Sequence, residues 1–196
     1  MNPPAKLGAA FEPLIARLEL APENLHRVAG CTTAESAVSV LEGAGALTDA
    51  VRVAAHALPR REAVWWACMC ARAVPSRPQR VEDMTALDAA EAWVRRPDEP
   101  CRRAAHAAAG RAGFSSAEAW AAMGAFWSGG SMAPEGQPVV APAEDLTGKA
   151  VSGSILITAA RREPERGEAR LRRFLAAARD IAGGGAGRIP EEVAER

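Results

Sequence analysis

Two cysteines and two tryptophans crowd the stretch VWWACMC at residues 64–70, where neighbouring thiols could bind a metal or exchange electrons. Zinc sites commonly use a C-x₂₋₄-C spacing on a loop, and redox pairs use C-x-x-C at a helix N-terminus. Cys68 and Cys70 are separated by a single residue, which in a helix directs their side chains to nearly opposite sides. Cys31 and Cys101 have no histidine or cysteine at ligand spacing. We therefore expect buried thiols, with no metal and no cofactor.

The other residues capable of catalysis form no recognisable motif. His56 and His106 each follow two alanines in alanine-rich segments, where a core histidine bonded to a backbone carbonyl is the more common outcome. A G-x-S-x-G elbow, an H-E-x-x-H pair and a phosphate-binding P-loop are all missing from the sequence. The sequence therefore gives no indication of an enzyme.

The charge balance limits the classes of partner. Lys plus Arg and Asp plus Glu each total 24, so the formal net charge is zero. Dedicated nucleic-acid binders depend on uncompensated Lys and Arg, so no nucleic-acid partner is expected. A pI of about 6.8 leaves little self-repulsion near neutral pH, which favours association, including a homo-oligomer. Because the chain shows no signal-peptide pattern and no long apolar run, we expect a cytoplasmic protein without membrane insertion.

Most segments between glycines and prolines show helical periodicity, and strand signals are weak. We therefore predict an all-α protein of seven to nine helices, packed as an irregular bundle or a short stack of helical hairpins. The expected helices are 32–43, 48–58, 60–74, 81–96, 99–110, 115–127, 146–162 and 164–182.

Hydroxyl side chains mark several expected helix starts. Thr32 with Glu35 has the spacing of a capping box, and Thr48, Asp98, Ser115 and Thr147 precede further helices. The apolar positions of these helices predict the core, which should include Val51, Val64, Trp65, Cys68, Leu87, Trp93, Trp120, Phe126 and Leu171. The arginines of the last helix lie away from its apolar stripe, which favours a solvated face.

These boundaries divide the chain into an N-terminal segment (1–20), a helical domain (21–183) and a flexible tail (184–196). The one long irregular piece is the Gly- and Pro-rich loop SGGSMAPEGQPVVAPAED at 128–145. Loops of this length in compact domains are uncommon and are often functional. Residues at its start could present an extended edge to a partner protein, and we take them as the candidate partner-binding site: Trp127, Gly129, Gly130, Ser131, Met132 and Pro134.

Several segments carry a family resemblance, chiefly WWAC, RRAAHAAAG and FWSGGSMAP. Between roughly residue 20 and residue 180 the chain resembles an uncharacterised bacterial family whose members are sometimes mislabelled as twin-arginine translocation signal proteins. The arginine pairs of this chain lie inside the domain, so that label does not fit it. The family looks like one encoded near type VI secretion components, which implies an accessory or effector-loading role.

Three functional hypotheses follow. The first is a non-enzymatic interaction module, an adaptor or chaperone-like accessory protein of a type VI-like secretion system that binds another protein. The second is a small enzyme or ligand-binding protein that uses the Trp127–Met132 loop with a histidine, which requires a concave pocket beneath that loop. The third is an RNA or membrane-surface binder that acts through the arginine-rich last helix.

Overall fold

The computed structural model describes residues 6–192, which form ten α-helices, two short 3-10 helices and no strand. The all-α prediction is confirmed, and the helix count exceeds the expected seven to nine because short helices form before residue 30. The elements are η1 (Lys6–Gly8), α1 (Glu12–Ile15), α2 (Pro22–Val28), α3 (Ala34–Gly43), α4 (Leu47–Ala57), α5 (Arg60–Ala73), α6 (Val81–Arg95), α7 (Glu99–Arg111), α8 (Ala117–Phe126), α9 (Leu146–Ala159), η2 (Pro164–Arg166) and α10 (Gly167–Ala182).

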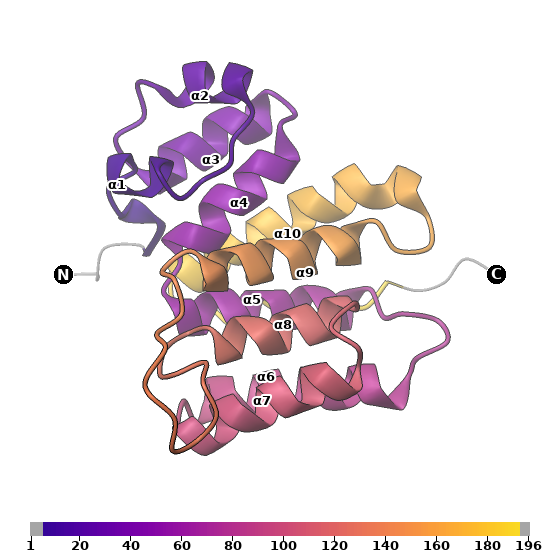
Figure 1. Cartoon of the computed structure of the whole chain (residues 1–196). Helices are drawn as coiled ribbons and strands as arrows, with labels where there is room; N and C mark the ends of the chain where they lie inside the picture. Colours follow the sequence, from indigo (N-terminus) through magenta and orange to yellow (C-terminus); the bar gives the residue numbers. More distant parts are fainter. Residues whose placement is uncertain (1–5, 193–196) are drawn as a thin grey trace.

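Three helices form the centre of the bundle. Helices α5, α8 and α9 contact one another and lie side by side across the middle of Figure 1. Helices α6 and α7 cover one side of this layer, while α4 and α10 pack on the other. The short helices α1–α3 gather around α4 at the N-terminal end of the chain (Figure 1). The long loop joins the central helices α8 and α9, so its position is set by the best-packed part of the molecule.

Small residues let the central helices approach closely. Helix α8 is rich in alanine, and nine of its ten residues are buried. A Cβ placed at Gly124 would lie 3.3 Å from methyl groups of both Val64 on α5 and Val151 on α9. The alanine-rich composition is therefore a packing requirement of a helix surrounded on all sides.

Several helix starts differ by one residue from the predicted caps. Asp98 caps α7 as predicted, accepting from the Cys101 N–H at 2.8 Å. At α3 the capping box is formed by Thr33 and Ser36, and Thr32 with Glu35 was wrong. Helix α8 is capped by Ser116 in place of Ser115. Helix α4 begins at Leu47, before the predicted Thr48 cap.

Thr147 does not cap α9, contrary to the prediction. It is the second residue of the helix, and Asp145 occupies the cap position without a side-chain hydrogen bond to the N–H groups of the first turn. The Thr147 side chain is buried, and its hydroxyl has no hydrogen-bond partner among the described residues.

Seven of the nine predicted core residues are buried, and two tryptophans are not. Trp65 and Trp120 are only partly buried at the edge of the core. The fully buried tryptophan is Trp66, whose Nε1 donates to the Phe174 carbonyl of α10 at 2.7 Å. Because Trp65 and Trp66 lie about 100° apart on one helix, only one of them can face α10.

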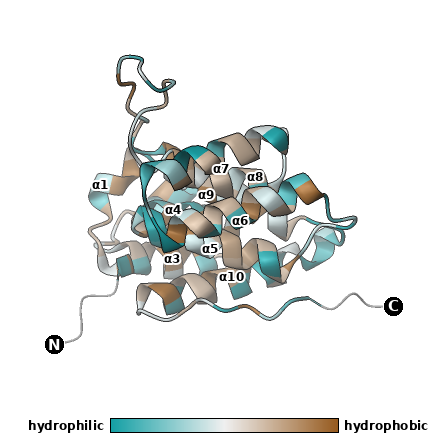
Figure 2. Ribbon diagram, turned by 90° about the horizontal axis from the view of Figure 1, so that it is seen from below, coloured by the Kyte–Doolittle hydropathy of each residue, from teal (hydrophilic) through white to brown (hydrophobic). Residues whose placement is uncertain are grey.

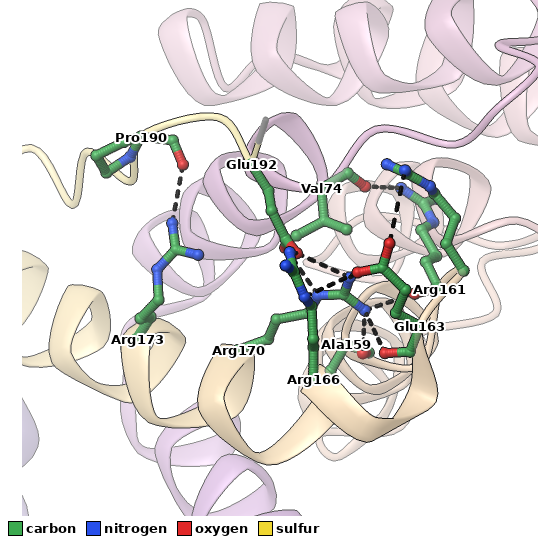
Figure 3. A network of polar contacts seen from close by, with 10 residues as sticks. Val74, Ala159, Arg161, Glu163, Arg166, Arg170, Arg173, Pro190 and Glu192 are labelled. Atoms are coloured by element: carbon green, nitrogen blue, oxygen red, sulfur yellow. Dashed lines mark hydrogen bonds and ion pairs between the residues drawn. The ribbon is translucent and has the colours of Figure 1, made fainter. Parts of the chain in front are cut away.

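The expected tail from residue 184 makes contacts as far as Glu192, and residues 193–196 lie outside the described part of the chain. Trp65 donates to the Ala186 carbonyl at 2.8 Å, and the Glu192 N–H donates to the Ala73 carbonyl at 2.7 Å. Figure 3 shows Arg170 of α10 between the Glu192 carboxylate and the carbonyl groups that follow α9. Residues 186–192 therefore lie against α5 and α10.

The arginine-rich face of α10 is not the solvated surface that was predicted. Arg170 is only 2% exposed, and Arg179 pairs with Glu35 and Glu42 of α3. Arg173 donates to the Pro190 carbonyl at 2.9 Å. Most of this positive charge therefore serves contacts inside the molecule. Within residues 6–192, no helix combines the length and the apolar content needed to cross a bilayer.

Candidate functional site

The loop between α8 and α9 is fastened to α7 by a buried arginine. Arg102 is 3% exposed, and it donates to the carbonyl groups of Phe126 at 2.6 Å and Ser131 at 2.8 Å. Its charge is balanced by a two-pronged contact with Glu99 on its own helix, at 2.6 and 2.7 Å. These hydrogen bonds lower the pKa of Glu99 to about 2. Charge-assisted bonds of this kind fix direction as well as distance, so the first residues of the loop are held firmly.

Aromatic contacts strengthen this attachment. The Phe126 ring lies 4.6 Å from the Arg102 guanidinium carbon and stacks on the His106 ring with centroids 4.2 Å apart. Arg103 adds a bond from its Nη1 to the Ala133 carbonyl at 2.8 Å. Burial beside these two arginines lowers the pKa of His106, so the stacked ring is neutral at pH 7.

Gly130 permits the close approach of Arg102. Its φ is +65°, a conformation that side chains rarely adopt, and a Cβ there would lie 2.9 Å from the Arg102 guanidinium. Gly130 was predicted to belong to a partner-binding edge. In the structure it leaves room for the arginine beneath the loop.

Hydrogen bonds within the loop close its base. The Ser131 hydroxyl accepts from the N–H groups of Ala133 and Val140, each at 3.1 Å. The Met132 N–H donates to the Val140 carbonyl at 2.7 Å. The segment between these residues forms a closed surface loop, of the kind that often carries function. It projects from the body of the molecule, as Figure 2 shows.

The projecting part, residues 134–141, is exposed throughout. Val139 is 79% exposed and Val140 49%, and these are the large apolar side chains of the loop. Pro134 and Pro138 flank the turn in which the Gln137 N–H donates to the Pro134 carbonyl at 3.2 Å, and the proline rings restrict the backbone there. The tip therefore combines apolar side chains with restricted backbone freedom.

The predicted site residues occupy the base more than the tip. Trp127 packs partly buried on the core, with its ring edge-on to Trp120, and Met132 is also half-buried against the core. Gly129, Gly130 and Ser131 form the turn held by Arg102, and Pro134 begins the exposed arm.

Sequence analysis missed Arg102, Arg103 and Val139. The adjacent arginines in EPCRRAAHAAAG were visible, but only the tertiary fold places them beneath the loop.

The two neighbouring cysteines lie apart in the core, as the helical geometry predicted. Cys68 and Cys70 are both fully buried on α5, and burial raises the pKa of each thiol well above its ordinary value. In the part of the chain that the structure describes, no group of three or more metal-binding side chains comes together. These sulfurs act as small apolar groups that fill the space between helices.

Comparison with known protein families gives a match. The sequence model of DUF6931, described as a family of unknown function, matches residues 37–182. The search of curated proteins and the search of solved structures each found no match.

Proposed function

The chain belongs to DUF6931, a family of unknown function, which confirms the expectation of an uncharacterised family. We propose that it is a non-enzymatic protein-interaction module that binds its partner through the loop tip at 134–141. The observation that carries this proposal is the pairing of a tightly fastened loop base with exposed apolar residues at the tip.

The ordered loop tip has an entropic cost that its own contacts do not offset. Burying the Arg102 charge requires desolvation, and ordering a loop of this length opposes folding through its lost entropy. Yet the tip residues add nothing to the core, since residues 134–141 are exposed. A loop ordered in advance loses less entropy when a partner binds, so the arrangement favours recognition.

The partner that best fits this tip is a protein with an apolar groove. Val139 offers an apolar contact at the tip, and Val140 adds an exposed apolar side chain where the loop base closes. The neighbouring Pro138 favours an extended segment that can lie along such a groove. Following the resemblance to a family encoded near type VI secretion components, we extend the proposal to a cytoplasmic adaptor or chaperone-like protein for a secretion component or effector.

Site-specific crosslinking tests the proposal. A photo-crosslinking amino acid at Val139 is compared with the same residue at Val81, which is 77% exposed at the start of α6. We expect one defined adduct from position 139 in the native cell and none from position 81. The captured protein is then purified, and its affinity for the Val139→Glu and Val81→Glu variants is measured by calorimetry.

The expected result is a loss of affinity of about tenfold or more for Val139→Glu, because a charge in an apolar contact is costly to desolvate. Val81→Glu should bind like the unaltered chain. Equal crosslinking at both positions, or equal affinity of both variants, would overturn the proposal.

A second candidate function is supported by a cavity at the two ends of the same loop. Arg60, which donates to the Ser128 carbonyl at 2.6 Å, and Glu144 both line it, together with His56. This arrangement favours the binding of a small ligand.

A further inference from the structure

A small cavity of about 80 Å³ lies between the end of α4 and the start of α9. Its walls include His56 from α4 and Thr147 and Gly148 from α9, with Arg17, Arg60 and Glu144 nearer the surface. A single water needs roughly 10–15 Å³ of such space, so the cavity accommodates a group of several heavy atoms.

His56 lines this space and has one ring nitrogen without a hydrogen-bond partner in the described chain. Its Nδ1 lies 2.8 Å from the Arg52 carbonyl, which can only accept, so Nδ1 carries the hydrogen. Nε2 is buried and has no partner among the described residues. Burial lowers the pKa of His56, which keeps the ring neutral and leaves Nε2 as a hydrogen-bond acceptor.

Thr147 lines the same cavity and carries a second unpartnered polar atom. Thr147 is only 2% exposed, and its Oγ1 has no partner in the described chain. An isolated buried hydroxyl costs free energy unless something bonds to it. Two residues that line one cavity thus each carry an unpartnered polar atom, which points to a ligand with polar groups.

The start of α9 supplies donors at this point. The N–H groups of a helix's first turn have no partners within the helix, and they favour negative charge. The Leu146 and Lys149 N–H groups bond to the Ala143 and Asp145 carbonyls, whereas no such backbone acceptor is placed for Thr147 in the described chain. Helix α9 has 14 residues, long enough for this effect.

Gly148 makes the meeting of α4 and α9 possible. A Cβ at this position would lie 2.5 Å from His56 Cδ2 and 2.7 Å from its Nε2. Only glycine leaves room for the ring beside the helix start. Glycine lowers the stability of a helix, but at this position it allows the His56 imidazole to lie against the start of α9.

The surface side of the cavity carries one uncompensated positive charge. Arg17 and Glu144 form an ion pair, so their charges balance. Lys149, next to the cavity, is paired with Asp145 at 3.0 Å and with Glu19 at 2.9 Å. No carboxylate within residues 6–192 pairs with Arg60, whose guanidinium bonds to the neutral Ser128 carbonyl. The charged side chains that line the cavity therefore sum to one positive charge, which favours an anion, while Glu19, the second carboxylate on Lys149, is 77% exposed outside the lining.

We infer that this cavity binds inorganic phosphate, with a P–O–H group donating to His56 Nε2 and the other oxygens accepting from Thr147 and the first turn of α9. This is a binding site separate from the proposed protein-binding tip. The ligand must be small, anionic and still able to donate one hydrogen bond. Inorganic phosphate meets all three conditions, because both of its forms near pH 7 retain a proton.

Sulfate is the discriminating probe. It has the size and tetrahedral shape of phosphate but carries no proton, so one of its lone pairs would face the lone pair of Nε2. Sites that bond a ligand hydroxyl discriminate strongly against analogues that lack it. We therefore expect phosphate to bind clearly tighter than sulfate at the same ionic strength.

The experiment measures phosphate and sulfate binding to the full chain at pH 7 by calorimetry and by the shift in Tm. Thr147→Val keeps the side-chain shape and removes the hydroxyl. We expect it to lower phosphate affinity by about fivefold or more, the loss of one good hydrogen bond. Without phosphate, its Tm should be unchanged or higher, because an unpartnered buried hydroxyl has gone.

Thr158→Val is the matched control on the same helix. Thr158 is fully buried, and its hydroxyl donates to the Ser154 carbonyl at 2.8 Å, away from the cavity. This variant should lose some stability and bind phosphate like the unaltered chain. Equal binding of phosphate and sulfate, absence of phosphate binding, or full phosphate affinity in Thr147→Val would each overturn the inference and leave a cavity that holds water.

Discussion

Two buried arginines, Arg102 and Arg170, each hold an irregular segment of the chain against a helix, but they do so differently. Both are nearly inaccessible, at 3% and 2% exposure. Both donate to backbone carbonyls, Arg102 to those of Phe126 and Ser131 and Arg170 to those of Ala159 and Arg161, the latter at 2.5 Å. A guanidinium suits this task because its five donors can reach several acceptors at once.

The difference lies in the carboxylate that balances each charge. Arg102 pairs with Glu99 on its own helix, and that side chain is 48% exposed. Arg170 pairs with Glu192 in the segment that it holds, and that side chain is 11% exposed. Arg102 thus fastens the loop only through neutral carbonyls at its base, which leaves the loop tip free, whereas the C-terminal segment is fastened by a buried charge pair. The Arg102 contacts leave the loop tip exposed to solvent, whereas the Arg170 contacts pack the C-terminal segment against the protein.

Removing Arg170 should have the larger effect on stability. Arg170→Met leaves the buried Glu192 carboxylate with Arg166 as its remaining partner, and it leaves several carbonyls without donors. We expect the free energy of unfolding to fall by about 3–5 kcal/mol. Urea unfolding followed by circular dichroism measures the loss. Arg173→Met serves as the control, since Arg173 is exposed and makes a single carbonyl contact in the same segment. A loss below 1 kcal/mol for Arg170→Met would show that the pair is not a main support.

Acid should release the C-terminal segment before the loop. The Arg170 guanidinium, followed by that of Arg166, lowers the pKa of Glu192 to about 2. A carboxylate with a depressed folded pKa stabilises the fold above its unfolded value and loses this contribution as pH falls through the folded value. The window is therefore about pH 4.5 to 2, and the contribution is at most about 3 kcal/mol.

Hydrogen exchange of residues 186–192, followed from pH 5 downward, measures this release. Glu192→Gln should remove most of the pH dependence and expose the segment already at pH 5. Glu99 also has a pKa lowered to about 2, but its exposure allows solvent to screen the interaction, so the loop should respond less. A loop that opened at higher pH than the C-terminal segment would reverse the comparison.

Removing Arg102 should have an intermediate effect, confined to the loop. Arg102→Met leaves the Phe126 and Ser131 carbonyls unpaired, while Glu99 can turn to solvent, so we expect a loss of about 2 kcal/mol. Hydrogen exchange should increase in residues 127–140 and remain unchanged in 186–192. Increased exchange in both segments would indicate a general loss of stability and would remove the distinction between them.

The sequence predicted the helices well because their signals are local. The expected start of α5 at residue 60 and the Asp98 cap of α7 are correct, and apolar periodicity gave most of the core. Caps were misplaced by one residue where two hydroxyl residues adjoin, at Thr32–Thr33 and Ser115–Ser116. Either residue of such a pair can cap, and the packing of the helix decides between them.

The candidate sites were harder to predict because distant segments create them. The apolar stripe of α10 predicted a solvated arginine face, yet Glu192 covers Arg170 in the folded chain. In the same way, Thr147 was predicted to cap a helix from its position in the sequence. In the folded chain it lines a cavity together with His56 of α4. No pattern within one helix indicates which remote residues will cover its polar face.

The smallest predicted effect is the difference in stability between two glycine substitutions in the loop. It separates the contribution of the Arg102 contact from that of the left-handed backbone. Gly130 and Gly136 both have positive φ, +65° and +81°, but only at Gly130 would a Cβ meet another group, the Arg102 guanidinium. Each substitution to alanine should cost about 1 kcal/mol for the left-handed backbone. Gly130→Ala should add a further cost, because the added methyl displaces the guanidinium from the Ser131 carbonyl. Chemical unfolding of the two variants gives this difference directly, and equal losses would mean that Arg102 does not hold the loop at this turn.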